Sequence, residues 1–223
     1  MKTARAAKQG GTIDYCVLDD LPSLVWAANM ADLELHTFLH RAPALQRPTA
    51  LAFDLDPGPP ADILTCCEVA MRLKKLFDSL HLESFPKTSG SKGMQVYVPL
   101  NTSINYDRTK AFAHRTAELL EESLPGLVVS NMSKSLRRGK VFVDWSQNDD
   151  KKTTVSVYSL RAKDHPTVST PLQWKEVAAA LKKRVRLSFE SDAVLARVQK
   201  HGDLFAQVLT VKQKLPPLAA LVM

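Results

Sequence analysis

The sequence predicts an α+β fold, in which helices flank a mixed or antiparallel central sheet. Its predicted strands pair mostly through hairpins, and the helices group around them. Two long amphipathic segments, 61–80 and 106–124, supply such helices. A chain of 223 residues with 45% hydrophobic side chains can also bury a sizeable core. We therefore expect one domain, residues 12–223, built as two closely packed lobes.

The individual elements follow from side-chain periodicity and turn residues. The segment 1–11 is short and basic, ends in Gly10-Gly11, and is expected to be a flexible leader. Alternating or apolar runs predict strands at 13–18, 33–37, 50–56, 84–87, 95–98, 127–130, 140–145 and 154–160. Apolar stripes predict helices at 19–31, 61–80, 106–124, 171–183 and 191–200. The stripe of the first helix consists of Leu24, Val25, Ala28 and Ala31.

Composition narrows the class of protein and of partner. Lys and Arg outnumber Asp and Glu by 30 to 23, and the net charge of +7 favours polyanionic partners. Cys16, Cys66 and Cys67 provide neither a C-x-x-C spacing nor a disulfide framework, which suits a reducing cytosol. The sequence contains no run of membrane-spanning length and no signal peptide. We expect a cytoplasmic, nucleoid-associated protein with no membrane partner.

Three aspartates stand at the ends of two predicted strands. The strand period of two puts Asp54 and Asp56 on one face, with Cα atoms roughly 7 Å apart. Asp144 ends the strand at 140–145. Carboxylates this close repel each other unless hard cations neutralise them, and three can hold two divalent ions. Two simpler interpretations stay open: a solvated strand end at Asp54 and Asp56, and a turn cap at Asp144.

Basic and hydroxyl side chains lie near these acids in the sequence. The turn 87–93, KTSGSKG, offers the N–H, hydroxyl and ammonium groups of a phosphate cradle, although it lacks the P-loop spacing. The run 133–140 precedes Asp144, and Arg161 and Lys163 follow the next strand. These cations could hold triphosphate and DNA backbone, whereas solvated charge is the common explanation. His36 lies at a strand end, where phosphate or metal contact competes with a structural role.

Four stretches carry a resemblance to a known family. They are, in order, FDLDPGP, KTSGSKGMQVYVPL, MSKSLRRGKVFVDWSQN and VYSLRAKDHPTVSTPLQW. Together they resemble the polymerase domain of bacterial DNA ligase D and its stand-alone relatives, within the archaeo-eukaryotic primase superfamily. The resemblance runs from about Gly11 to about Lys200. It implies a primase-like catalytic core and a DNA-dependent nucleotidyltransferase that extends DNA 3′ ends or fills gaps in non-homologous end joining.

The resemblance also implies a role for each candidate residue. The catalytic, metal-binding residues would be Asp54, Asp56 and Asp144, with two Mn²⁺ or Mg²⁺ ions. The nucleotide-binding residues would be His36, Ser89, Lys92, Gln95, Arg137, Gln147 and Arg161. DNA contacts are expected from Lys134, Arg138, Lys140 and Lys163. The implied partners are DNA with breaks, gaps or overhangs, nucleoside triphosphates with ribonucleotides preferred, Ku, and an ATP-dependent DNA ligase.

The sequence departs from the family pattern in two places. Gln95 stands where family members usually have histidine, and glutamine can donate a hydrogen bond to phosphate but cannot carry positive charge. Weaker triphosphate binding is the expected result. Family domains usually have a further N-terminal section with a 5′-phosphate pocket and base-stacking aromatic residues, which this chain is expected to lack. A separate chain would then supply those parts, or the site would be reduced.

Three other functions remain as alternatives. The chain could be a non-catalytic subunit that binds DNA ends or primer-template, although a pure binder gains nothing from acids beside a phosphodiester backbone. It could be a DNA primase of the same superfamily. A phosphatase of the haloacid-dehalogenase type also begins its site with D-x-D after a strand. Such phosphatases resemble one another in a Thr or Val shortly afterwards, where this chain has Pro57-Gly58.

Overall fold

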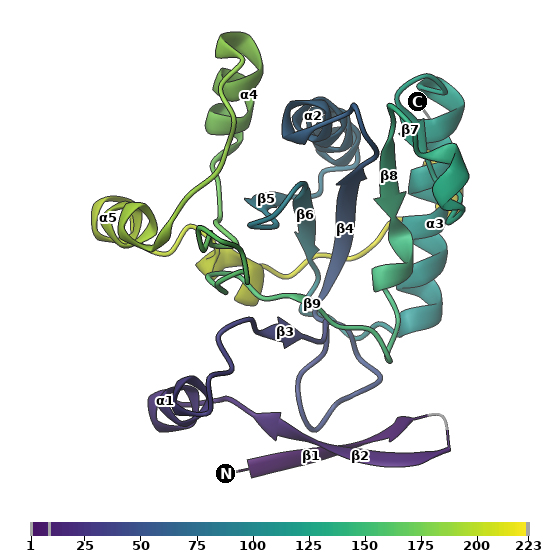
Figure 1. The fold of residues 1–223 in the computed structure, drawn as a ribbon. Coiled ribbons are helices and arrows are strands. Elements are labelled where there is room, and N and C mark those ends of the chain that lie inside the picture. The colour runs from purple at the N-terminus through teal and green to yellow at the C-terminus, as the bar shows by residue number, and fades with distance from the viewer. Residues whose placement is uncertain (1, 9, 222–223) are drawn as a thin grey trace.

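A five-stranded mixed sheet forms the centre of the molecule (Figure 1), whose computed structural model describes residues 2–8 and 10–221. The strand order is β5-β6-β4-β8-β7. The strands are β4 (Ala50–Pro57), β5 (Phe85–Thr88), β6 (Met94–Pro99), β7 (Val128–Val129) and β8 (Val141–Asp144). Neighbours are antiparallel except β7 and β8, which are parallel. The predicted α+β class is confirmed.

Helices and two small ribbons surround this sheet. The helices described are α1 (Leu21–Asn29), α2 (Ile63–Ser79), α3 (Tyr106–Ser123), α4 (Trp174–Lys183) and α5 (Ser191–His201). The ribbons pair β1 (Lys2–Lys8) with β2 (Gly11–Val17), and β3 (His36–Thr37) with β9 (Thr154–Val155). Short 3₁₀ helices are η1 (Lys134–Leu136), η2 (Trp145–Gln147), η3 (Ala206–Leu209) and η4 (Leu218–Ala220). Within residues 2–8 and 10–221, no helix has the length and apolar character needed to span a membrane.

One face of the sheet is the main hydrophobic core. Leu51, Phe53 and Leu55 of β4 are fully buried in one cluster with the apolar sides of α2 and α3. Each helix begins at a side-chain cap, Asp62 for α2 and Asn105 for α3, which satisfies backbone N–H groups of the first turn. Because successive side chains of a strand point to opposite faces, the alternate residues of β4 must lie on the other side of the sheet.

The opposite face is apolar at one end and polar at the other. Around the start of β4, Ala50 and Ala52 join a smaller cluster with Tyr97 and Phe205. Towards the end of β4, this face carries the acidic side chains Asp54 and Asp56. The β3–β9 ribbon is attached through Gln95 of β6, whose Nε2 donates to Thr154 Oγ1 at 2.7 Å. The strand pair that carries His36 is therefore joined to the sheet through the register partner of Asp54.

The N-terminal segment differs from its prediction. Residues 1–11 are expected to be a flexible leader, yet Lys2–Lys8 forms β1, which pairs along its whole length with β2. The glycines make a hairpin turn, with Gly10 at φ +85°, rather than a hinge. An ion pair of 2.8 Å between Arg5 and Asp14 joins the two strands. Met1 and Gln9 of this segment lie outside the described residues.

The predicted stripe of the first helix and two strand lengths also need correction. Leu24 and Val25 of α1 are 45% and 49% exposed, and only Ala27 of this helix is buried. The strands predicted at 33–37 and 154–160 shrink to two residues each. Periodicity marks which side chains can share a face, but pairing partners decide where a strand ends.

Candidate active site

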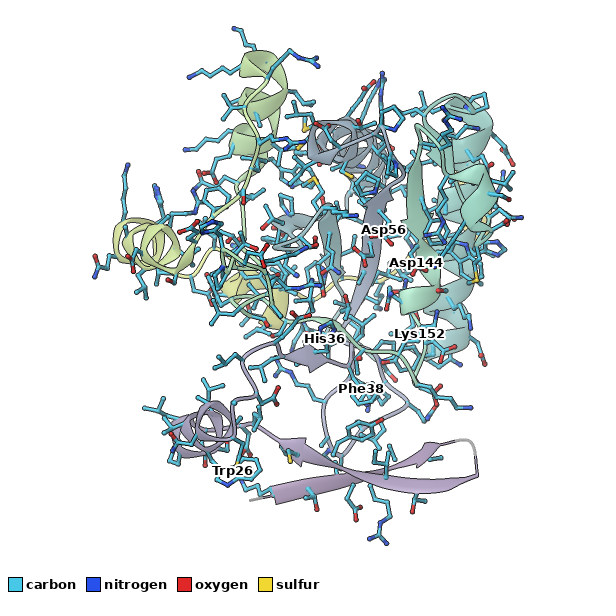
Figure 2. The ribbon with its side chains drawn as sticks, viewed as in Figure 1. Trp26, His36, Phe38, Asp56, Asp144 and Lys152 are labelled. Carbon is cyan, nitrogen blue, oxygen red and sulfur yellow. The ribbon has the colours of Figure 1, made fainter. Side chains whose placement is uncertain are left out.

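The strand register brings the three predicted aspartates onto one face of the sheet. Asp54 of β4 pairs directly with Asp144 of β8 on one side and with Gln95 of β6 on the other. Directly opposed residues of neighbouring strands point to the same face, and Asp56 shares it because it is two residues further along β4. Asp54 is partly buried, and Asp56 is more open to solvent as a whole residue, although neighbouring groups enclose its carboxylate. Figure 2 shows Asp56 and Asp144 on these adjacent strands, and Lys152 reaches the Asp144 turn through Ser146.

Asp144 also caps the turn that follows β8. Its Oδ1 accepts hydrogen bonds from the N–H and the hydroxyl of Ser146, at 2.9 and 2.5 Å. Its Oδ2 accepts one from Nε2 of Gln147 at 3.1 Å. Lys152 in turn donates to the Ser146 hydroxyl, which keeps a cation behind the acid. The turn cap considered as an alternative for Asp144 is confirmed, and Oδ2 retains a lone pair for a further ligand.

Burial and mutual repulsion disfavour the charged forms of Asp54 and Asp56. Burial, followed by the charge of Asp56, raises the pKa of Asp54 to about 7. Burial and Asp144 raise the pKa of Asp56, while Arg137 and Arg161 oppose that rise. Such carboxylates suit a hard cation. However, no group of three or more His, Cys, Asp or Glu side chains in the part of the chain described is arranged to hold a metal ion. The metal triad therefore stays a prediction.

The predicted phosphate cradle is the turn between β5 and β6. The N–H and hydroxyl of Ser89 both donate to the carbonyl oxygen of Gly93, each at 3.0 Å, so Ser89 shapes the turn. A Cβ on Gly93 would lie 2.0 Å from the carbonyl oxygen of Leu55. Glycine is therefore required for the turn to approach β4 this closely. Lys92 is exposed on this turn, which lies against the strand of the acids.

The basic segment before β8 is fastened to the end of β4. Gly58 donates its N–H to the carbonyl oxygen of Lys140 at 2.8 Å. A Cβ on Gly58 would lie 1.9 Å from the carbonyl oxygen of Arg137, so only glycine fits. The Arg137 guanidinium lies 3.8 Å from the centroid of the Phe142 ring, and Phe142 is the register partner of Asp56. Arg137 is thus held beside the acids.

His36 and Arg161 meet at a residue that the sequence did not single out, Glu34. Glu34 Oε1 lies 3.1 Å from both His36 Nε2 and Arg161 Nε, and its Oε2 accepts the Ala162 N–H at 2.8 Å. Arg161 Nη1 also donates to the carbonyl oxygen of Ser89 at 2.9 Å. Three predicted nucleotide-binding residues from distant segments therefore lie together. The only sequence signal for Glu34 was its place on the polar phase of the strand predicted at 33–37.

Two buried polar residues support Asp54 across the sheet. Lys87 of β5, Gln95 of β6 and Asp54 of β4 are consecutive register partners. Lys87 is fully buried, donates to Ser169 Oγ at 2.6 Å, and has a pKa lowered by burial to about 7. Gln95 is 1% exposed and its amide nitrogen donates to Thr154, and its predicted phosphate contact stays a prediction. Its amide favours the charged form of Asp54.

The remaining predicted contacts fall into two surface segments. Lys134 and Arg138 are exposed and Lys140 is partly buried, all in the segment tied to the end of β4. Lys163 is exposed in the loop that follows Arg161. Gln147, predicted to contact nucleotide, is bonded to Asp144. The two basic segments thus extend from the arginines that act electrostatically on Asp56.

Comparisons with known proteins point to one family. The family described as "LigD, primase-polymerase domain" matches residues 1–205. A "Multifunctional non-homologous end joining protein LigD" of Mycolicibacterium smegmatis is 43% identical over 204 residues, which are 89% of this chain and 26% of that protein. A "Bifunctional non-homologous end joining protein LigD" of Bacillus subtilis is 33% identical over 196 residues, 87% of this chain and 31% of that protein. The chain spans between about a quarter and a third of these relatives.

A solved structure agrees with the sequence comparisons. The "Polymerase Domain from Mycobacterium tuberculosis Ligase D in complex with DNA" matches with a TM-score of 0.86 and 38% identity. The match covers 95% of this chain and 75% of that chain. Together with the family match over most of its length, this likeness shows that the chain belongs to the LigD primase-polymerase domain family.

Proposed function

We propose that this chain is a DNA-repair nucleotidyltransferase that adds nucleotides to DNA 3′ ends or fills gaps during non-homologous end joining. Family membership supports the reaction class, because the relatives are named as non-homologous end-joining proteins and the solved neighbour is a polymerase domain in complex with DNA. The observation that carries the proposal is the direct pairing of Asp54 with Asp144, next to an Asp56 on which Arg137 and Arg161 act electrostatically. That arrangement suits a triphosphate on one side and a DNA strand on the other.

The acids form the floor of the proposed site. Asp54, Asp56 and Asp144 supply carboxylate oxygens, the donors that Mn²⁺ and Mg²⁺ prefer. The raised pKa values of Asp54 and Asp56 fit this role, because a bound cation would remove the repulsion that raises them. Two such ions, when bound, would acidify the primer 3′-hydroxyl and neutralise charge on the leaving pyrophosphate. No side-chain general base is then needed.

The basic residues hold the substrates in this proposal. Arg137 and Arg161, both close enough to Asp56 to affect its pKa, would bind triphosphate oxygens together with His36 and Lys92. Ser89 would act through the turn it closes and through its carbonyl contact with Arg161. Gln147 and Gln95 would keep Asp144 and Asp54 in place rather than touch phosphate.

The DNA side of the site would be lined by the surface cations. Lys134, Arg138, Lys140 and Lys163 would contact the DNA backbone, where neutralised phosphates release counterions and make binding salt-dependent. Broken, gapped or overhanging DNA and ribonucleoside triphosphates are the substrates we propose. Ku and an ATP-dependent DNA ligase are the protein partners, and the nucleoid is the place of action.

Primer extension on gapped and 3′-overhang DNA tests the proposal. We expect extension with Mn²⁺ or Mg²⁺, faster with ribonucleotides, and lost in Asp54→Ala. The matched control is Asp32→Ala, because Asp32 is an exposed aspartate just before the β3 strand and should leave extension unchanged. Asp144→Asn should abolish incorporation yet keep most DNA binding. Extension that survives Asp54→Ala would exclude the assignment, and DNA binding without extension would favour a binding subunit.

A further inference from the structure

Glu34 joins the segments that carry three of the proposed nucleotide-binding residues. We propose that Glu34 is a positioning residue for triphosphate binding, which holds the Arg161 guanidinium and the His36 ring in place without touching the substrate itself. This inference rests on the proposed function. The observation behind it is that the Glu34 carboxylate contacts the His36 ring, the Arg161 guanidinium and the backbone N–H of Ala162.

The Glu34 carboxylate is itself firmly fixed. Its Oε2 accepts the N–H of Ala162 at 2.8 Å, and this hydrogen bond is the main cause of its lowered pKa. The side chain is 31% exposed and contacts Arg161, one of the two arginines that lower the pKa of Asp56. Because a backbone N–H anchors it, Glu34 acts as a fixed negative charge that cannot swing away when an anion arrives.

Arg161 is held on several sides by these contacts. Its Nε lies 3.1 Å from Glu34 Oε1 as an ion pair, although the angle leaves this buried N–H without a hydrogen bond. Its Nη1 donates to the carbonyl oxygen of Ser89. Its Cγ packs against Gly90, where an added Cβ would lie only 2.8 Å from it. A guanidinium has five N–H donors. Within residues 2–8 and 10–221, no acceptor bonds Nη2, so both of its donors can bind an oxyanion.

His36 is oriented by the same oxygen. Its Nε2 lies 3.1 Å from Glu34 Oε1, and the ring is 40% exposed. A partner at Nε2 sets the orientation of the imidazole ring and leaves Nδ1 for a ligand. Without Glu34, the exposed His36 ring and the long Arg161 side chain would each have to be ordered when triphosphate binds, which costs conformational entropy.

The test compares Glu34→Ala and Glu34→Gln with the control Glu68→Ala, an exposed glutamate on α2. Three quantities are measured: affinity for a fluorescent non-hydrolysable ribonucleoside triphosphate with Mn²⁺, KM and kcat in primer extension, and Tm. Loss of a group that orients a metal ligand typically lowers affinity or activity roughly 10- to 100-fold, and we take the same range for Glu34. We expect Kd and KM to rise by that factor in Glu34→Ala, with kcat changed less and Tm close to that of the control. Glu34→Gln should fall between wild type and Glu34→Ala.

A mutant cycle that removes both positioned residues separates positioning from general stability. If Glu34 acts through Arg161 and His36, adding Glu34→Ala to the Arg161→Ala/His36→Ala variant should raise Kd by less than about twofold. Additive losses, unchanged or tighter triphosphate binding, or losses that parallel Tm would each overturn the positioning role. If wild type binds no triphosphate at all, the proposed function fails instead. If wild type binds but Glu34→Ala binds equally well, only this inference fails.

Discussion

Asp54→Asn should stabilise the metal-free protein above neutral pH. Asparagine has nearly the shape of aspartate, keeps a polar side chain beside Gln95, and removes the charge that burial and Asp56 disfavour. That disfavour appears in the raised pKa of Asp54, about 7 against an ordinary value of 3.8. The substitution therefore removes a cost of folding while it also removes a proposed metal ligand.

The magnitude follows from proton linkage. Between pH 3.8 and about 7 the folded protein holds a proton that the unfolded chain has released. Stability from this group is therefore fully present below pH 3.8 and lost as the pH rises to about 7. Each unit of that interval is worth about 1.4 kcal/mol, which gives about 4 kcal/mol at pH 8 and about 1 kcal/mol at pH 4.5. Local relaxation reduces these values, so we expect a gain of about 2–4 kcal/mol at pH 8.

Denaturant unfolding and thermal unfolding in EDTA, both followed by tryptophan fluorescence, measure this difference at pH 8 and pH 4.5. For a chain of this length, 1 kcal/mol corresponds to about 2–4 °C in Tm, so the gain at pH 8 should exceed about 4 °C. Asp32→Asn, in an exposed position, is the control and should change little at either pH. A loss of stability in Asp54→Asn at pH 8, or the same change in stability at both pH values, would refute the argument that burial and the charge of Asp56 disfavour the charged form of Asp54.

Three further predictions test the same site. Mn²⁺ should raise the Tm of the wild type more at pH 8 than at pH 5.5, because Asp54 must release its proton before it can bind the ion. The Tm of Asp54→Asn should not rise at all, and a pH-independent shift of the wild type in differential scanning fluorimetry would contradict this prediction. Gly58→Ala should lower the free energy of unfolding by more than about 2 kcal/mol and weaken triphosphate binding, because the added Cβ would collide with the Arg137 carbonyl. Gly126→Ala is the control in denaturant unfolding and should be tolerated, because its added Cβ would meet nothing within 4 Å. Gln95→His should raise the rate of ribonucleotide incorporation near pH 6.5 by placing positive charge beside Asp54, and an unchanged rate would remove that explanation of the glutamine.

Local sequence patterns determined much of the scaffold. The two-residue period of a strand is set by backbone geometry, so it placed Asp54 and Asp56 on one face without any knowledge of neighbours. Apolar spacing likewise located α2 and α3, whose observed bounds differ from the predicted ranges by no more than two residues. The Gly/Ser turn between β5 and β6 was also predictable, because glycine and serine residues separate two short strand segments.

Only the tertiary structure decided which of these local features meet. Alternation cannot say that Asp54 opposes Asp144, since register depends on the partner strand. Nor can it say that Lys87 is buried, or that the basic leader becomes a hairpin. Glu34 is the clearest case, because its three contacts come from residues 2 to 128 positions away in the chain. Sequence periodicity reports the environment of a residue's own backbone, whereas a binding site is built from long-range contacts that form only when the chain is folded.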